Sequence, residues 1–348
     1  MSQDYFGRVS PPDEKVAEEA RAHHATLTKP AGSLGRLEDL GAWISSCMGE
    51  VPPRSLDDAR VVVFAGDHGV AAGGVSAYPA EVSIQMFENI VNGGAAINVL
   101  ARCNGASVYA ADISLDRDVD EAQAPFHVRR SCGSIDREDA MDEEELDRAI
   151  RAGIKLADDA IDSGAQLLVP GDLGIGNTTP AAVLIGHVAG REPVEVVGRG
   201  TGIDDEGWKR KCAAVRDAMF RVRRLRNQPL EILRRASSPD LAAMAAFIAR
   251  AASRRTPVLL DGLVVTSAAV MADELAPGAA RWMVAGHRGA EPAHAIALRH
   301  LGLEPLLDYG MRLGEGSGAA LSLGVLQSAV AIMRDMATFD SAGVSEKA

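Results

Sequence analysis

The chain contains few cysteines, and they are far apart. The four are Cys47, Cys103, Cys132 and Cys212; they form no CxxC pair, and the chain starts without an apolar leader. A disulfide framework or a thiolate metal site needs closely patterned cysteines, so neither is expected. We expect a reducing, cytoplasmic location.

Basic clusters and long apolar runs are also missing. Lys and Arg number 36 against 48 Asp and Glu, which gives a net charge of −12. Binding a polyphosphate backbone requires clustered positive charge, so nucleic acid is not expected as a partner. No uninterrupted apolar stretch reaches the roughly 20 residues that span a bilayer, so the sequence predicts no integral membrane protein.

Aromatic residues make up 4% of the 348 residues, whereas 47% are hydrophobic and 35 are glycine. A chain of this size can bury a large core, and glycine-rich turns suit an α/β protein. Six short apolar runs predict buried strands; they cover 60–64, 107–110, 166–169, 257–260, 282–285 and 305–307. None of these runs alternates clearly, as is typical of strands covered on both faces.

Helix-like segments separate the predicted strands. They include 80–91, 143–162, 179–188, 266–275 and 292–301. The repeated order of strand and helix predicts an α/β fold: a doubly wound parallel sheet of about six strands. Several strands end in glycine-containing turns, and ligands of such sheets bind beyond the carboxyl ends of the strands, so we expect these turns to form one crevice.

Two regions fall outside the repeat. The first 55 residues carry no strand pattern and the chain from Ala319 is helical, so we predict a catalytic domain over 56–318 and a small helical subdomain from 1–55 with 319–348. The stretch 116–147 is acidic and poor in apolar residues over its first half, which predicts a solvated connection.

The most informative motif is Met311 to Ala320, which reads MRLGEGSGAA. It sets Glu315 among glycines, which allow sharp bends and close approach of a ligand, and a helix-like segment follows. Glu315 is therefore the candidate catalytic residue. The alternative, in which its charge caps the following helix, is equally compatible with the motif.

Two further glycine-rich turns precede helices. Residues 171–180 (GDLGIGNTTP) follow a strand and end in hydroxyl side chains, as in a phosphate-binding turn, although the pattern matches neither a P-loop nor a dinucleotide fingerprint. A tight turn capped by Thr178 and Thr179 is the alternative. Residues 197–205 lead to a helix with Lys211, which either reaches a ligand anion or is solvated.

His68 and His287 with Glu291 and His294 suggest a metal site at first sight. Pro292 interrupts the second group, whereas zinc motifs place histidines four apart on one helical face. We therefore predict no metal site and assign these histidines to holding loops together. Tyr78 and Gln85 either line a slot for a flat heterocycle or belong to ordinary packing.

Five segments taken together resemble the nicotinate-nucleotide:dimethylbenzimidazole phosphoribosyltransferase family. They are 28–35 (TKPAGSLG), 65–70 (AGDHGV), 174–179 (GIGNTT), Asp261 with Gly262, and 312–318 (RLGEGSG). The resemblance implies transfer of phosphoribose from nicotinate mononucleotide to dimethylbenzimidazole in cobalamin synthesis, by a cytoplasmic homodimer without a cofactor. The family fold is a six-stranded parallel α/β domain with a small helical one.

The resemblance also implies roles for individual residues. Glu315 matches the general base of the family, and Asp172 stands where the family pattern has a glutamate. The residues expected to bind phosphate and nucleotide are Gly174, Gly176, Asn177, Thr178, Thr179, Gly202, Lys211, Asp261 and Gly262. Those expected at the acceptor base are Tyr78, Gln85, Leu313 and Asp172.

The implied reaction suits these residues. A pyridinium leaving group departs as a neutral ring and needs neither an acid nor a metal, whereas a pyrophosphate leaving group would require Mg²⁺. The attacking benzimidazole must lose a proton, and Glu315 is the candidate acceptor. Two other classes remain open: a Mg²⁺-dependent phosphoribosyltransferase of nucleotide metabolism and a non-catalytic nucleotide-binding protein.

Overall fold

The computed structural model describes residues 5–120, 122 and 124–345 and contains one six-stranded parallel sheet. Its strands are β1 (Ala59–Gly66), β2 (Ser107–Ser114), β3 (Leu167–Leu173), β4 (Val258–Leu260), β5 (Met283–His287) and β6 (Pro305–Leu307). They lie in the order β2-β1-β3-β4-β5-β6, and every adjacent pair is parallel. The predicted fold class and all six predicted strands are confirmed.

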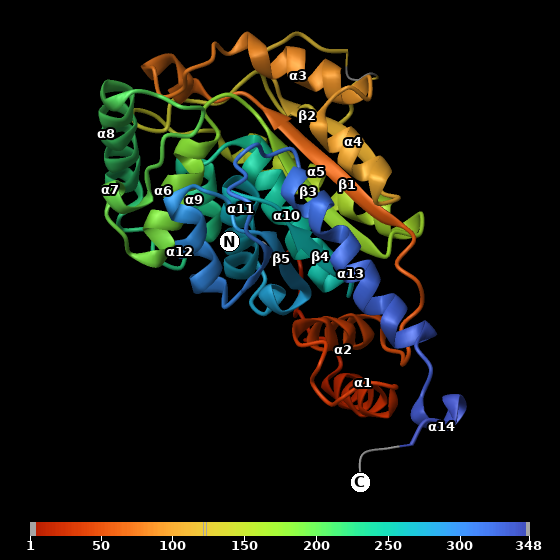
Figure 1. Cartoon of the computed structure of the whole chain (residues 1–348). Coiled ribbons are helices and arrows are strands. Elements are labelled where there is room, and N and C mark those ends of the chain that lie inside the picture. Colours follow the sequence, from red (N-terminus) through yellow and green to blue (C-terminus); the bar gives the residue numbers. More distant parts are fainter. Residues whose placement is uncertain (1–4, 121, 123, 346–348) are drawn as a thin grey trace.

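Helices cover both faces of the sheet (Figure 1). The α-helices before β3 are α1 (Glu14–Thr26), α2 (Arg36–Met48), α3 (Glu81–Val91), α4 (Ala96–Cys103) and α5 (Glu143–Asp162). The later ones are α6 (Thr178–Ala189), α7 (Pro193–Val196), α8 (Asp205–Val222), α9 (Pro229–Ala236), α10 (Pro239–Ser253), α11 (Leu263–Leu275), α12 (Pro292–Leu301), α13 (Ser317–Asp335) and α14 (Phe339–Ala342). Two 3₁₀ helices, η1 (Gly69–Gly73) and η2 (Ala279–Trp282), complete the described elements.

The strands supply side chains to two separate cores. Val62 and Phe64 of β1 belong to the larger core, with α5, α10 and α11, whereas Val61 and Val63 belong to a second core with α2 and α13. This alternation follows from the two-residue repeat of a strand. The strand sequences are therefore apolar at nearly every position, because both faces are buried.

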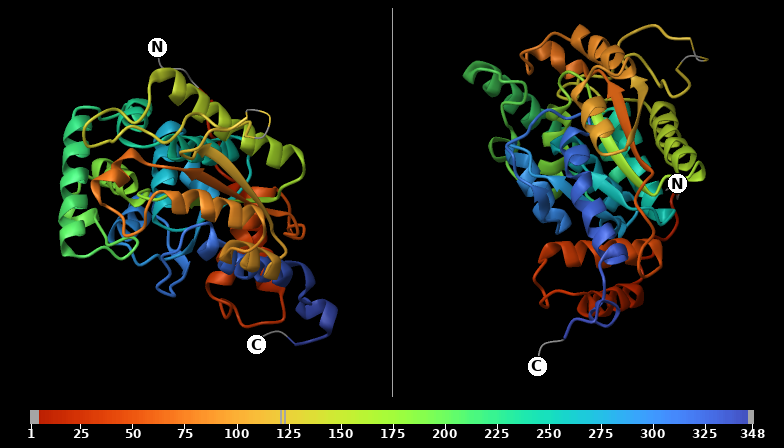
Figure 2. Two further views of the ribbon diagram at one scale, coloured as in Figure 1. Left: turned by 90° about the horizontal axis from the view of Figure 1, so that it is seen from above. Right: turned by 45° about the vertical axis from the view of Figure 1, so that its right-hand side comes forward.

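Helices α1 and α2 lie at one end of the molecule, beside the last part of α13 (Figures 1 and 2). A single bridge joins Leu27 to Thr338, and the N–H of Thr28 donates to the carbonyl of Ala337. The first part of α13, however, packs on the sheet with β5 and α4. The proposed subdomain boundary at Ala319 stays a prediction, and residues 1–4 and 346–348 lie outside the described part.

Helix α13 is long and apolar enough, by length and composition, to cross a membrane. About half of it, 56%, is buried inside the protein. A core helix that packs on a sheet shows the same composition, because its inner face and much of its flanks are covered.

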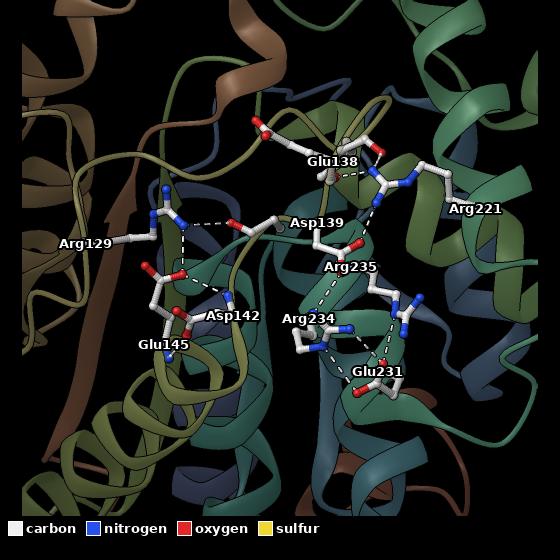
Figure 3. Close-up of polar contacts among 11 residues, drawn as sticks. Arg129, Glu138, Asp139, Asp142, Glu145, Arg221, Glu231, Arg234 and Arg235 are labelled. Atoms are coloured by element: carbon white, nitrogen blue, oxygen red, sulfur yellow. Dashed lines mark hydrogen bonds and ion pairs between the residues drawn. The ribbon is translucent and has the colours of Figure 1, made fainter.

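The connection that precedes α5 is more ordered than its composition predicts. Cys132, Ile135 and Met141, in its second half, are buried in the larger core. Figure 3 shows how ion pairs hold this segment: Asp139 contacts Arg221 of α8 and, at 2.8 Å, Arg234 of α9. The prediction of a solvated connection is therefore wrong for its second half, because charged side chains satisfy one another there over buried apolar residues.

We predict that Asp139→Ala lowers the free energy of unfolding by about 1–2 kcal/mol, because two arginines, both less than a third exposed, lose the carboxylate that they share. Urea unfolding measures this, and the difference from wild type should shrink in high salt. Asp118→Ala is the control, since Asp118 is 93% exposed and should cost less than about 0.5 kcal/mol. Equal losses for the two variants would contradict the assignment.

Candidate active site

A cavity of about 510 Å³ opens beyond the carboxyl ends of β3, β4 and β5. The turns after these three strands contribute to its wall, as do α3 and the segment that leads into α13. The residues that line it are Tyr78, Val82, Ser83, Met86, Asp172, Leu173, Gly174, Ile175, Asn177, Thr178, Gly200, Thr201, Gly262, Leu263, Val264, His287, Gly289, Ala290, Glu291, Met311, Arg312, Leu313, Gly314 and Glu315.

The structure brings together eight of the fourteen residues expected from the sequence. Those that line the cavity are Tyr78, Asp172, Gly174, Asn177, Thr178, Gly262, Leu313 and Glu315. The other six do not line it; they are Gln85, Gly176, Thr179, Gly202, Lys211 and Asp261. Gln85 is exposed on α3, Gly202 is exposed, and Thr179 is fully buried within α6.

Lys211 lies directly behind the cavity wall. Its Nζ donates to Thr178 Oγ1 at 2.7 Å and to the carbonyl oxygen of Gly198 at 3.4 Å. Thr178 is the first residue of α6, and a helix N-terminus favours anions. Burial lowers the pKa of Lys211 to about 8, although the Glu291 carboxylate opposes the shift. This end of the cavity can hold a phosphate.

Glu315 lies in a strained bend at the other side of the cavity. Gly314, Glu315 and Gly316 all adopt left-handed backbone conformations, with φ of 87°, 64° and 86°. Glycine takes this conformation at no steric cost, but glutamate does not. The bend is fixed by the N–H of Glu315, which donates to the carbonyl of Asp172 at 3.0 Å.

The bend also lies tightly against β3. A Cβ atom on Gly171 would come within 2.4 Å of the Glu315 carbonyl oxygen. Glycine at 171 is therefore required for the two backbones to touch. This contact explains a glycine in the middle of a buried strand.

The Glu315 side chain does not cap α13. It is 3% exposed, and one carboxylate oxygen, Oε2, is buried with no hydrogen-bond partner among the described residues. Burial raises the pKa of Glu315, while the backbone N–H of Ile97, at the start of α4, lowers it. A buried carboxylate with a raised pKa and a free oxygen beside a cavity is suited to accept a proton.

Asp261 caps α13 in place of Glu315. Its two carboxylate oxygens accept the N–H groups of Gly316 at 3.1 Å and Ala319 at 2.9 Å, and Nε2 of His287 lies 3.2 Å away. Asp261 is fully buried. Asp261 holds the backbone of the bend and does not line the cavity. The sequence predicts a different place for it, among the phosphate-binding residues.

The pKa of Asp172 is raised as well. Burial first, and then the carboxylates of Asp261, Asp240 and Glu315, raise its pKa far above the usual range. The amide of Asn177 donates to its Oδ2 at 2.8 Å and acts in the opposite direction. Asp172 therefore favours the protonated form, in which its hydroxyl can donate a hydrogen bond.

Sequence reasoning missed several lining residues. Glu291 and Arg312 belong to different turns, and their side chains meet at one residue: Gly200 N–H donates to Glu291 Oε1 at 2.9 Å, and Arg312 donates to the Gly200 carbonyl at 2.8 Å. His287 was expected only to hold loops together, but it lines the cavity. Arg312 belongs to the 312–318 motif but was given no role of its own, and Glu291 was considered only as a metal ligand, because the fold alone brings the two side chains to Gly200.

Comparison with known proteins assigns the family. A family profile described as Phosphoribosyltransferase matches residues 9–344. The nicotinate-nucleotide-dimethylbenzimidazole phosphoribosyltransferase of Corynebacterium efficiens is 66% identical and covers 98% of this chain and 92% of its own length. The chain belongs to the nicotinate-nucleotide-dimethylbenzimidazole phosphoribosyltransferase family. It is therefore an enzyme of the phosphoribosyltransferase class, which excludes the non-catalytic alternative.

Other members of the nicotinate-nucleotide-dimethylbenzimidazole phosphoribosyltransferase family agree. The protein of that name from Mycolicibacterium paratuberculosis is 58% identical over 98% of both chains. The crystal structure of CobT from Thermus thermophilus is 41% identical, with a TM-score of 0.91 over 96% of this chain and all of that one. The similarity therefore covers nearly the whole chain.

We predict that Gly171→Ala destabilises the protein by about 1–3 kcal/mol, because the added methyl group overlaps the Glu315 backbone and no side chain can move aside. Thermal unfolding measures the loss. Gly73→Ala, whose Cβ meets nothing within 4 Å, serves as the matched control and should shift stability by less than about 1 kcal/mol. An unchanged melting temperature for Gly171→Ala would show that the bend does not rest on β3.

Proposed function

We propose that this enzyme transfers phosphoribose from nicotinate mononucleotide to 5,6-dimethylbenzimidazole, giving α-ribazole 5′-phosphate and nicotinate for cobalamin synthesis. The proposal rests on one observation: a single cavity has an end suited to an anion and, apart from it, a buried carboxylate suited to accept a proton. Thr178, with Lys211 directly behind it, gives one end that suits an anion, and Glu315 offers a buried carboxylate near Asp172. The related enzymes, which are named for nicotinate nucleotide and dimethylbenzimidazole, support the same two substrates.

In this proposal the C1′–N bond to the pyridinium breaks and its electron pair returns to the ring nitrogen, so nicotinate leaves as a neutral ring with its carboxylate. A benzimidazole nitrogen forms the new bond to C1′. Its second nitrogen then carries an acidic N–H, and Glu315 accepts that proton. Attack on the face opposite the leaving group inverts C1′ and gives the α-linked product.

The acceptor ring would lie among Tyr78, Met86 and Leu313, which line the cavity. Tyr78 is 55% and Leu313 57% exposed, which leaves apolar surface for a flat ring to cover. Protonated Asp172 would donate a hydrogen bond to a substrate. Its shorter side chain, compared with the glutamate of the family pattern, still receives the Asn177 amide at 2.8 Å.

Homodimer formation and cytoplasmic location also stay proposals. Light scattering during gel filtration would measure the first. Independence of Mg²⁺, expected for a pyridinium leaving group, is checked by assaying turnover with a chelator, which separates this reaction from a Mg²⁺-dependent transfer.

We predict that Glu315→Gln lowers kcat by about 10²–10⁴-fold while the dissociation constant of nicotinate mononucleotide changes little, since the amide keeps the shape of the side chain but accepts no proton. Product formation and calorimetry measure the two quantities. Glu304→Gln removes an exposed carboxylate elsewhere and should behave as wild type. Normal turnover by Glu315→Gln would exclude Glu315 as the base.

We predict that donor binding weakens as the pH rises through about 8, because Lys211 loses its proton there and no longer attracts the phosphate. The donor phosphate is already fully ionised above about pH 7.5, so it does not contribute to this change. Calorimetry with nicotinate mononucleotide from pH 7 to 10 measures the effect. Lys211→Arg keeps its charge and should move the loss to higher pH; an unchanged midpoint would refute the role of Lys211.

A further inference from the structure

Glu291 holds its carboxylate inside the anion-binding end of the cavity. It precedes α12 and lines the cavity, and its Oε1 accepts the N–H of Gly200 at 2.9 Å. The contact is close: a Cβ on Gly198 would lie 1.9 Å from Oε2, so glycine at 198 makes room for the carboxylate. Any side chain at position 198 would therefore collide with the Glu291 carboxylate.

One oxygen of the Glu291 carboxylate lacks a hydrogen-bond partner within the described part of the chain. Oε2 is buried and has no hydrogen-bond partner among the described residues, and no Lys or Arg nitrogen in that part of the chain lies within 4 Å of Glu291. Burial lowers the pKa of Lys211 and the Glu291 charge opposes that shift, but the Lys211 ammonium donates its hydrogen bonds to Thr178 and Gly198 and not to Glu291. Burying one oxygen of a carboxylate without a hydrogen-bond partner is costly, and a role in ligand binding would account for an acid at this position.

The groups around Glu291 are those that a phosphate would use. A Cβ on Gly200 would lie 3.1 Å from Thr178 Oγ1 and 3.2 Å from Lys211 Nζ, so the Gly200 backbone borders both donors. Arg312 holds the Gly200 carbonyl from the other side at 2.8 Å. The Gly200 N–H, the Thr178 hydroxyl and the Lys211 ammonium thus form one set of donors, one of which Glu291 already occupies.

We propose that the Glu291 carboxylate takes the place of the substrate phosphate before substrate binds and competes with it for the Gly200 N–H. This inference rests on the proposed function, since it takes the donor phosphate to bind beside Lys211. Binding of a phosphate releases the Gly200 N–H from the carboxylate, and the repulsion between the two anions weakens binding of every phosphate that enters. The carboxylate thereby lowers the affinity of the site for phosphate groups and favours product release.

The proposal predicts a gain of affinity on mutation, which loss of an ordinary binding residue does not give. In Glu291→Gln the amide oxygen still accepts the Gly200 N–H, but the negative charge is gone. Calorimetry should show inorganic phosphate and nicotinate mononucleotide binding at least about fivefold more tightly than to wild type. In turnover, KM for the donor should fall, and kcat should fall or stay constant as the product phosphate leaves more slowly.

Two variants separate charge from shape. Glu291→Asp keeps the charge and should show no tightening, and Glu274→Gln removes an exposed carboxylate outside the cavity and should leave the affinity unchanged. Unchanged or weaker phosphate binding by Glu291→Gln would overturn the proposal. Binding of inorganic phosphate needs no turnover, so this result is independent of whether the enzyme makes α-ribazole 5′-phosphate.

A measurement on the unmodified protein covers the case in which Glu291→Gln fails to fold. The Gly200 amide changes its acceptor from carboxylate to phosphate, so its ¹H–¹⁵N resonance should shift as inorganic phosphate is added. The amide of Gly105, in a turn far along the chain, is the internal reference. A Gly200 resonance that stays fixed at saturating phosphate would also overturn the proposal.

Discussion

The buried carboxylate of Asp261 is the interaction on which the site depends. It follows β4 directly and receives the N–H groups of Gly316 and Ala319, so it ties the end of the central sheet to the start of α13. The left-handed bend of Gly314, Glu315 and Gly316 would cost free energy on its own. Charge-assisted hydrogen bonds from backbone N–H groups to a buried carboxylate are strong enough to hold the bend.

The same acid links the bend to the next strand. His287, the last residue of β5, lies with Nε2 3.2 Å from Asp261 Oδ1, and a Cβ on Gly318 would overlap its ring. The close approach of α13 to β5 therefore needs glycine at 318. One carboxylate thus connects the ends of two strands and a helix, so Glu315 is positioned by the sheet rather than by its loop.

Much of the fold could be predicted because its pattern is local. Buried parallel strands are short apolar runs between turns, and all six were recognised from that feature. Helix α10 was not recognised from the sequence. Of its 15 residues 13 are buried, so its sequence has no polar face to reveal a helical repeat. The ordered segment before α5 was missed because its stability comes from arginines of α8 and α9, far along the chain.

The site residues also fall into two groups: those that the local sequence indicated and those that only tertiary packing brings together. Glu315, Asp172 and Thr178 were identified because glycines surround them in the sequence, and the three line one cavity. Glu291 and Arg312 also have glycines nearby in the sequence, but their meeting at Gly200 depends on how three turns pack, which no single motif shows. Asp261 was placed with the ligand because its motif was recognised, but its direction, toward the α13 backbone, is set by tertiary structure.

Buried side chains beyond the carboxyl end of β1 determine where the cavity lies. In an open parallel sheet the crevice lies where the strand order reverses, here between β1 and β3. Buried His68 and Asp240 occupy that place, with 3.7 Å between His68 Nε2 and Asp240 Oδ2, and Gly174 and Gly66 fit against them. The open volume is thereby displaced toward β4 and β5. Because the Asp240 charge also raises the pKa of Asp172, this filled end shapes the chemistry of the site without facing the ligand.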